Sequence, residues 1–298
     1  MSVRVSVVVP FFNAEPMLAH CLAALAGQSF AKGDYEVIAV DDGSTDDGAA
    51  VAARCGVRLV QQENRGAAAA RNAGIRVATG RWVAFTDADC IPSRAWLARL
   101  VAAAEQADPD ALGAAGATIG FQSETPAARY VDLAGGLDAE RHLAHARFPF
   151  APSANVMYRR DALERVGGFD ERYGAYDACD LHTRLRRSAG GAFPFEPSAV
   201  VLHRHRTTWS GYWRQQRGYG RGLAQFYLRH REEVPWSAWR EARGWAALLP
   251  VAASALVFRR GDQGLVRRGK LVKDLAQRLG FATCYFSSRE RRRWREPR

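Results

Sequence analysis

The stretch Arg81-Trp-Val-Ala-Phe-Thr-Asp-Ala-Asp-Cys-Ile-Pro92 places four apolar residues shortly before two aspartates that stand one residue apart. Trp82–Phe85 is a short, continuous apolar run, which is typical of a strand buried on both faces. Side chains alternate in an extended chain, so Asp87 and Asp89 are expected to face roughly the same side. The stretch therefore predicts a buried strand whose end delivers two carboxylates to one place.

Other strands precede this one, and helical patterns lie between them. Val3–Val9 and Tyr35–Val40 are apolar runs, and Val57–Val60 is a shorter one. Met17–Leu25 has apolar residues at helical spacing, and Gly66–Ala78 is an alanine-rich helical stretch. Strands that alternate with helices predict an α/β fold with a mainly parallel sheet flanked by helices.

A further helix is predicted over Ala49–Arg54, with Ser44 or Thr45 as its capping residue. Beyond residue 110 the alternation is weaker. A helix interrupted at Gly135-Gly136 and a return to the sheet at Pro152–Tyr158 are still expected.

Polar residues follow three of the predicted strands. They are Pro10–Asn13, Asp41-Asp42 and Asp87–Asp89. In open sheets of this kind, ligands bind beyond the carboxyl ends of the strands. We therefore expect these three clusters to meet at one rim of the sheet.

Charge is distributed unevenly along the 298 residues, whose formal net charge is +11. Residues 201–298 hold 22 Lys and Arg against 7 Asp and Glu, a surplus of 15 positive charges, whereas residues 1–200 hold 20 against 24. The sequence thus predicts a globular domain over residues 1–210 and a helical, basic extension over residues 211–298.

The extension carries two features that bear on its role. Residues 212–230 mix aromatic residues with arginines, which is typical of a basic amphipathic helix. Trp245–Phe258 is an uncharged, mostly apolar run interrupted by Pro250. A membrane span needs roughly 20 such residues. The run is therefore expected either to lie on a membrane or to pack as a buried hairpin. Charge alone does not separate an anionic membrane surface, nucleic acid and simple solvation as explanations for the positive charges. We expect no nucleic acid as a partner, because no nucleic-acid-binding module is visible.

Cellular location is predicted from the cysteines and the amino terminus. The five cysteines are far apart and form no C-x-x-C pair, which favours free thiols in a reducing compartment. Residues 1–12 do not have the pattern of a secretory signal. We expect a cytoplasmic protein that can associate peripherally with the inner face of the membrane.

Two aspartates at a strand end have a direct chemical interpretation. Mg²⁺ and Mn²⁺ prefer carboxylate oxygens, and Mg²⁺ is commonly shared between carboxylates and substrate phosphates. For an isolated D-x-D the simpler alternative is a loop in which one Asp caps the next helix and the other is solvated. Asp41-Asp42 can accept hydrogen bonds from a base or a ribose, or serve only as a turn. Arg71 can pair with phosphate, or be a surface arginine.

Six segments together resemble family 2 glycosyltransferases with the GT-A fold. In order, these segments are "VSVVVPFFNAE", "VDDGSTDD", "ENRGAAAARNAGI", "ATGRWVAFTDADCIP", "SANVMYRRDAL" and "VGGFDERY". They cover about residues 3–205, and the ordered set is more specific than any one of its members.

The resemblance implies a nucleotide-sugar donor, with UDP-, GDP- and dTDP-sugars left open, a divalent Mn²⁺ or Mg²⁺, and inversion at the anomeric carbon. It implies donor-binding roles for seven residues and metal-binding roles for two. The donor-binding residues are Pro10, Phe11, Asn13, Asp41, Asp42, Arg71 and Asp87, and the metal-binding residues are Asp89 and His203. Taken alone, a histidine at a strand end is more often structural or solvated than a metal ligand.

The motif that supplies the catalytic base in the family is incomplete in this chain. There a Glu-Asp pair often precedes a helix with D-L-x-x-R, whereas this chain has "AYDACDLHTRL". Asp177 matches the Glu, Ala178 replaces the Asp, and Asp180 begins the remaining motif. Both aspartates are catalytic candidates, and Asp177 is preferred because Asp180 can instead cap the helix or pair with Arg184.

The predicted function is non-processive, metal-dependent transfer of a sugar to a glycan or a polyprenyl- or lipid-linked acceptor, in cell-surface polysaccharide or glycolipid synthesis. The incomplete base keeps an alternative open, a GT-A domain that binds nucleotide or glycan as a scaffold. A nucleotidyltransferase would favour a glycine-rich basic loop after the first strand, where this chain has "PFFNAE".

Overall fold

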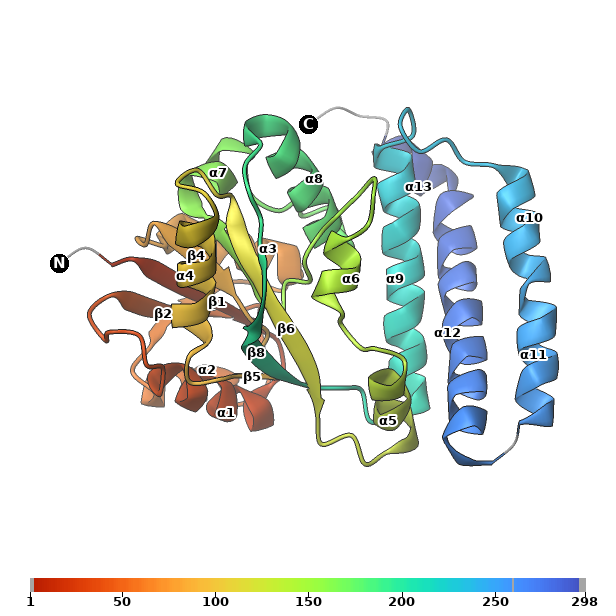
Figure 1. Ribbon diagram of the computed structural model, residues 1–298, viewed down its shortest axis with the longest axis horizontal. Helices are drawn as coiled ribbons and strands as arrows, with labels where there is room; N and C mark the ends of the chain where they lie inside the picture. The colour runs from red at the N-terminus through yellow and green to blue at the C-terminus, as the bar shows by residue number, and fades with distance from the viewer. Residues whose placement is uncertain (1–2, 259, 295–298) are drawn as a thin grey trace. The chain divides into compact units, whose positions relative to one another are not determined.

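The computed structural model describes residues 3–258 and 260–294, which form two compact units (Figure 1). The first unit runs to Phe121 and also includes Leu137–Arg172 and Asp177–Arg204. The second unit comprises Gln122–Gly136, Tyr173–Tyr176 and the chain from His205 onward. Each predicted site residue lies in the first unit.

A mixed sheet forms the first unit, with eight strands in the described part of the chain. Four of its seven strand pairs are parallel and three are antiparallel, in the order β3-β2-β1-β4-β7-β6-β8-β5. The predicted α/β class is confirmed, and the parallel pairs from β3 to β4 carry the three polar strand ends. The strands are β1 Val5–Phe11, β2 Tyr35–Asp41, β3 Arg58–Gln61, β4 Trp82–Phe85, β5 Cys90–Pro92, β6 Gly113–Phe121, β7 Val156–Arg159 and β8 Phe195–Arg204.

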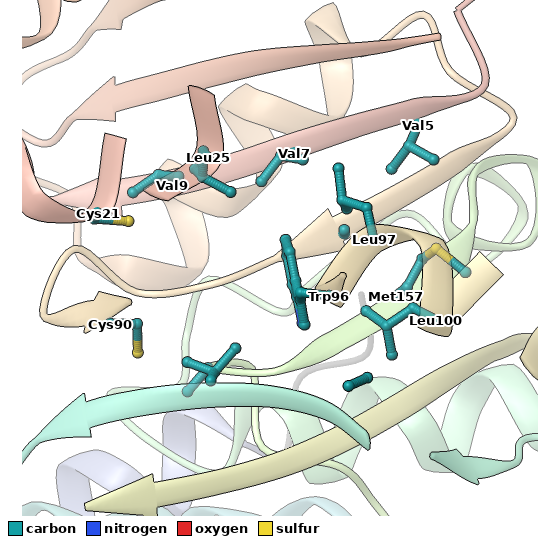
Figure 2. Packing of buried hydrophobic residues seen from close by; sticks show 14 of the residues in the cluster. Val5, Val7, Val9, Cys21, Leu25, Cys90, Trp96, Leu97, Leu100 and Met157 are labelled. Atoms are coloured by element: carbon teal, nitrogen blue, oxygen red, sulfur yellow. The ribbon is translucent and has the colours of Figure 1, made fainter. Parts of the chain in front are cut away.

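Alternation along β1 divides the core into two layers. Val5, Val7 and Val9 pack with side chains of α1, α2 and α4, whereas Val8 packs with side chains of α3 and α8. Figure 2 shows the first layer, in which Trp96 and Leu97 of α4 lie among these valines. The helices of this unit are α1 Glu15–Ala26, α2 Gly48–Arg54, α3 Ala67–Val77, α4 Trp96–Ala107, α6 Ala139–Leu143, α7 Arg160–Arg165 and α8 Asp177–Ala189.

One local prediction was wrong. Neither Ser44 nor Thr45 caps α2, because the helix begins after Asp47 and has no side-chain cap. The Ser44 hydroxyl instead accepts a hydrogen bond from the backbone N–H of Asn13, at 3.0 Å. The segment after β2 therefore joins two strand ends before the helix starts.

The second unit is helical. Its elements are α5 Pro126–Leu133, α9 Trp209–Arg229, α10 Ala238–Ala246, α11 Leu248–Val257, α12 Gly261–Tyr285 and α13 Ser288–Arg293. Helix α12 packs against α9, α11 and α5 (Figure 1). In the described part of the chain, none of the helices combines the length and the apolar character needed to cross a membrane.

Glycines allow α9 and α12 to pack closely. A Cβ atom on Gly220 would lie 1.9 Å from the backbone oxygen of Gln277, and one on Gly280 would lie 2.1 Å from that of Arg217. Real side chains do not tolerate such distances. The predicted amphipathic helix over residues 212–230 is therefore present as α9, with small residues facing its neighbour.

The apolar run Trp245–Phe258 forms the end of α10 and all of α11. Pro250 is accommodated in the first turn of α11, where a missing N–H costs no helical hydrogen bond. Within α11 only Ala255 is buried. The structure therefore contains no buried hairpin at this run.

Candidate active site

The ends of β1 and β2 lie next to each other because these strands pair in parallel. Pro10 pairs with Val40 and Phe11 with Asp41. The Phe11 carbonyl accepts a hydrogen bond from the Asp42 N–H at 2.9 Å, and the Phe11 ring is buried in the core. Pro10 and Phe11 therefore contribute backbone to the rim, while the half-exposed ring beyond them belongs to Phe12.

Asn13 ties the loop after β1 to the loop after β2. Its side-chain oxygen accepts hydrogen bonds from the N–H and the hydroxyl of Thr45, at 2.8 and 3.2 Å. Its backbone has φ of 49°, a left-handed conformation that asparagine tolerates better than most residues. Asn13 thereby fixes the shape of the rim beside Asp41 and Asp42.

The Asp41 and Asp42 carboxylates are buried and largely occupied by protein donors. Asp42 accepts hydrogen bonds from the Gln62 side chain at 2.7 Å and from the backbone N–H groups of Arg65 and Gly66 at 2.9 and 2.8 Å. Asp41 accepts from the Ser44 N–H at 2.8 Å. Of these three hydrogen bonds, Asp42 Oδ2 accepts only the one from Gly66, so this oxygen has capacity for a further donor.

Arg71 of α3 joins two carboxylates from different elements. Its guanidinium donates to Asp177 Oδ2 at 2.9 Å and to Asp87 Oδ1 at 3.1 Å. Burial favours the neutral form of Arg71, but the charges of Asp177 and Asp87 oppose this and raise its pKa. Its guanidinium carbon also lies 5.6 Å from the centre of the Phe169 ring. The candidate base Asp177 is therefore held beside the first aspartate of the D-x-D motif.

The two aspartates of the D-x-D motif have different partners. Asp89 Oδ1 lies 3.6 Å from His203 Nε2 and 3.9 Å from Cys90 Sγ. Cys90 and His203 are paired residues on the antiparallel strands β5 and β8, so the sheet register brings them together. Asp87 pairs with Arg71 instead.

The Asp89, Cys90 and His203 side chains fit a divalent cation. Their ligand atoms all lie within 4.8 Å of one another, close enough to contact one ion. The Asp89 carboxylate is a donor that Mn²⁺ and Mg²⁺ prefer, whereas an imidazole and a sulfur donor are more typical of Zn²⁺ and other transition metals. Burial, followed by the charges of Asp87 and Asp89, raises the pKa of the Cys90 thiol.

Asp180 is buried and paired with an arginine of its own helix. It is fully buried on α8, and its carboxylate accepts from Arg184 Nε at 2.7 Å. The same guanidinium donates to the carbonyls of Val166 and Gly168, both at 2.8 Å. Asp180 therefore ties α8 to the turn after α7, whereas Asp177 begins the helix and points to Arg71.

Asn72, next to Arg71, anchors the "GGFDERY" turn and was not identified from the sequence. Its amide exchanges hydrogen bonds with the backbone of Phe169, at 2.8 and 2.9 Å, and donates to Glu171 at 2.9 Å. Gly168 has φ of +67°, and a Cβ there would lie 2.5 Å from the Asn72 oxygen. The Arg71-Asn72 and Gly167-Gly168 dipeptides mark the two sides of this contact in the sequence, but their pairing is visible only in three dimensions.

Tyr158 of β7 was also not identified. Its hydroxyl is buried and has no hydrogen-bond partner in the described part of the chain. Burial, with the nearby Asp177 carboxylate as the next contribution, raises its pKa. The Tyr158 hydroxyl is therefore a buried polar group close enough to Asp177 to feel its charge.

Sequence comparison matches residues 6–167 to the family model described as Glycosyl transferase family 2, which is more than half of the chain. The chain belongs to glycosyl transferase family 2. The resemblance noted in the sequence is thereby confirmed. The predicted donor- and metal-binding residues from Pro10 to Asp89 all lie within the motifs that carried it.

Relatives of this chain include proteins named as glycosyltransferases. The pre-mycofactocin glycosyltransferase of Mycobacterium tuberculosis is 34% identical over 241 residues, 77% of this chain and 49% of that protein. Glycosyltransferase AglE of Haloferax volcanii is 30% identical over 206 residues, 67% of this chain and 66% of that protein. The chain thus spans about half the length of its mycobacterial relative.

Solved structures confirm the GT-A fold of this family 2 member. The mannosyltransferase PcManGT from Pyrobaculum calidifontis, solved with GDP-Man and Mn²⁺, matches with a TM-score of 0.66 at 23% identity over 96% of this chain and 87% of that chain. S. aureus TarS 1–349, solved with UDP, matches with a TM-score of 0.56 at 19% identity over 94% and 91%.

Proposed function

We propose that this chain is an inverting, metal-dependent glycosyltransferase that moves a sugar from a nucleotide-diphosphate sugar to a glycan or lipid-linked acceptor. Its product would enter a cell-surface polysaccharide or a glycolipid. The observation that carries the proposal is the Arg71 bridge between Asp87 and Asp177. The bridge holds a carboxylate suited to act as a base next to the strand end where GT-A proteins bind the donor.

The nucleoside would bind at the ends of β1 and β2. Asp42 Oδ2 would accept from the base or ribose, and the exposed ring of Phe12 offers a stacking surface. Pro10, Phe11, Asn13 and Asp41 shape this surface through their backbone and loop contacts. PcManGT was solved with GDP-Man and TarS with UDP-GlcNAc, so both nucleotides are reasonable donors to test beside dTDP-sugars.

Asp89 and His203 would hold a Mn²⁺ or Mg²⁺ ion, with Cys90 beside them. When bound, the ion offsets negative charge on the departing diphosphate. Asp87, fixed by Arg71, would orient the ribose or the donor sugar. Support for the cation comes from the Mn²⁺ in the PcManGT complex.

Asp177 would act as the general base. Its carboxylate takes the proton of the acceptor hydroxyl as the hydroxyl oxygen attacks the anomeric carbon. The bond from that carbon to the diphosphate breaks, and its electron pair leaves with the nucleotide. Attack from the opposite side inverts the configuration. Asp180 would act as a positioning residue through Arg184 and the turn that packs on α3.

A second candidate is a domain that binds nucleotide or glycan without turnover. It is favoured by Ala178, which stands where the family often has a carboxylate. The two candidates share donor binding and differ in turnover, so binding and transfer have to be measured separately. Either protein would act in the cytoplasm or at the inner face of the membrane.

Donor binding tests the site directly. UDP-, GDP- and dTDP-sugars are added to the protein with Mn²⁺ or Mg²⁺, and the melting temperature is measured. One donor should stabilise the wild type only with metal, by about 2.7 kcal/mol at a hundred times its Kd. Asp89→Ala should lose this effect, and Glu105→Ala, in an exposed ion pair on α4, should keep it. A wild type that no donor stabilises with either metal would contradict the proposal.

A further inference from the structure

An apolar face of α11 is exposed. Leu249, Leu256 and Val257 are 73%, 66% and 74% exposed, and Phe258 follows directly after the helix. Pro250 and Ala253 are also exposed, so the exposed positions recur at helical spacing along one stripe. No charged residue occurs between Trp245 and Phe258.

The opposite face of α11 is apolar as well. Leu248, Val251 and Ala252 are half-buried, Ala255 is buried, and the helix packs against α12. A helix that is apolar all round is normally buried on all sides. In α11 the face toward α12 is covered, and the outer face consists of large aliphatic side chains in contact with solvent.

Cations occur on both sides of this apolar stripe in the sequence. Residues 238–270 hold seven Lys and Arg, of which Lys270 is paired with Asp274, and two acidic residues, Glu241 and Asp262. Both acidic groups are engaged by arginines outside the segment, Asp262 by Arg129 at 2.9 Å and Glu241 by Arg278 at 3.6 Å. Arg267 lies over the ring of Phe258 at 5.2 Å. The stripe therefore has a cationic border.

The length of α11, its apolar stripe and the nearby cations together favour an anionic membrane as the partner of this face. The ten residues of α11 extend about 15 Å, half the thickness of a bilayer core, so the helix can lie in the membrane surface but not cross it. A second copy of the chain would bring two cationic borders together, which repel each other. An anionic bilayer accepts aliphatic side chains below the headgroups and attracts the cations above them.

We propose that α11 is a membrane-docking helix. Leu249, Leu256 and Val257 insert below the headgroups of an anionic bilayer, and the exposed Trp239 of α10 lies at the headgroup level. The arginines on either side contact lipid phosphates. The biological role of this docking rests on the proposed function, because a lipid-linked acceptor would be reached at a membrane surface.

Sedimentation with lipid vesicles tests the docking helix. The full-length protein should bind vesicles that contain phosphatidylglycerol, bind less at high salt, and bind weakly to pure phosphatidylcholine. Leu249→Glu with Val257→Glu should weaken binding about tenfold or more, because two aliphatic side chains no longer insert. The matched control is Leu133→Glu on α5, which also alters an exposed leucine and should bind as the wild type does.

Two further measurements keep the outcomes distinct. Unchanged melting temperatures show that the variants fold, and donor-dependent stabilisation in the double variant reports on the active site alone. Equal vesicle binding by wild type and double variant would overturn the docking helix while leaving the proposed function intact. Concentration-dependent dimers that the double variant abolishes, without vesicle binding, would identify a second copy as the occupant and overturn it as well. Loss of donor binding with vesicle binding retained would contradict only the proposed function.

Discussion

Arg71 holds two carboxylates that lie 16 and 106 residues away in the chain. A buried guanidinium is stable there because both partners are charged and hydrogen-bonded to it. Arg71 therefore both stabilises the fold and positions the candidate base Asp177.

Replacing Arg71 with methionine leaves Asp177 and Asp87 without their cation. We expect the free energy of unfolding to fall by about 3 kcal/mol, because removal of one partner leaves charge that is poorly solvated. Urea unfolding at pH 7 measures this. The control is Arg65→Met, which breaks an exposed pair with Glu171 and should cost less than about 1 kcal/mol. Equal costs for the two variants would contradict the bridge.

His182 of α8 should make stability depend on pH. Burial, followed by the charge of Arg186, lowers its pKa from 6.5 to about 4. The native state then binds fewer protons than the unfolded state between these values, so stability is lost as the pH falls from about 6.5 to 4. The loss from this group approaches about 3 kcal/mol.

Unfolding free energies measured from pH 7 to 4 check this prediction. His182→Gln should show a shallower decline than the wild type, and His20→Gln, an exposed histidine on α1, should not differ from it. Parallel curves for wild type and His182→Gln would mean that the buried ring does not titrate in this way.

Helix α3 carries Arg71 and Asn72, and Gly74 sets its distance from the sheet. A Cβ on Gly74 would lie 2.3 Å from a methyl group of Val8 on β1. Gly74→Ala should therefore destabilise the protein by about 1–3 kcal/mol, since the helix has to move outward. Thermal melting measures the loss. Gly33→Ala, where no atom lies within 4 Å, should be nearly neutral, and a loss of the same size there would remove the argument.

At the scale of elements, periodicity predicted most of the first unit. The strands from β1 to β4 and the helices between them follow from apolar runs and helical spacing, because each element buries a continuous face. The position of α2 was predicted, but its cap was not, because the Ser44 hydroxyl accepts a hydrogen bond from Asn13, 31 residues away. The covered and exposed faces of α11 were not separable in sequence, since both are apolar.

Motifs in the sequence single out the strand-end aspartates and Arg71, whose roles stay predictions. Phe12, Asn72 and Tyr158 were not singled out from the sequence. Their roles depend on which side of a strand or helix faces the rim. The resemblance already implied different roles for Asp87 and Asp89, but their partners, Arg71 and His203, required the structure.

For the whole molecule, charge and chemistry are separated along the chain. The candidate site lies in the first unit, and the surplus of 15 positive charges lies within residues 201–298. We interpret the first part as the transferase and the second as its link to an anionic surface. The alignment with PcManGT covers 96% of this chain, so it includes residues of both parts.

The central claim is sugar transfer with Asp177 as base. The direct measurement is transfer from the donor that binds, with a membrane extract as acceptor, by wild type, Asp177→Asn and Asp180→Asn. We expect Asp177→Asn to bind donor normally but to lose about a hundredfold or more in kcat, and Asp180→Asn to lose mainly stability. Loss of transfer only in Asp180→Asn, or donor binding by wild type without turnover on any acceptor, would contradict the account.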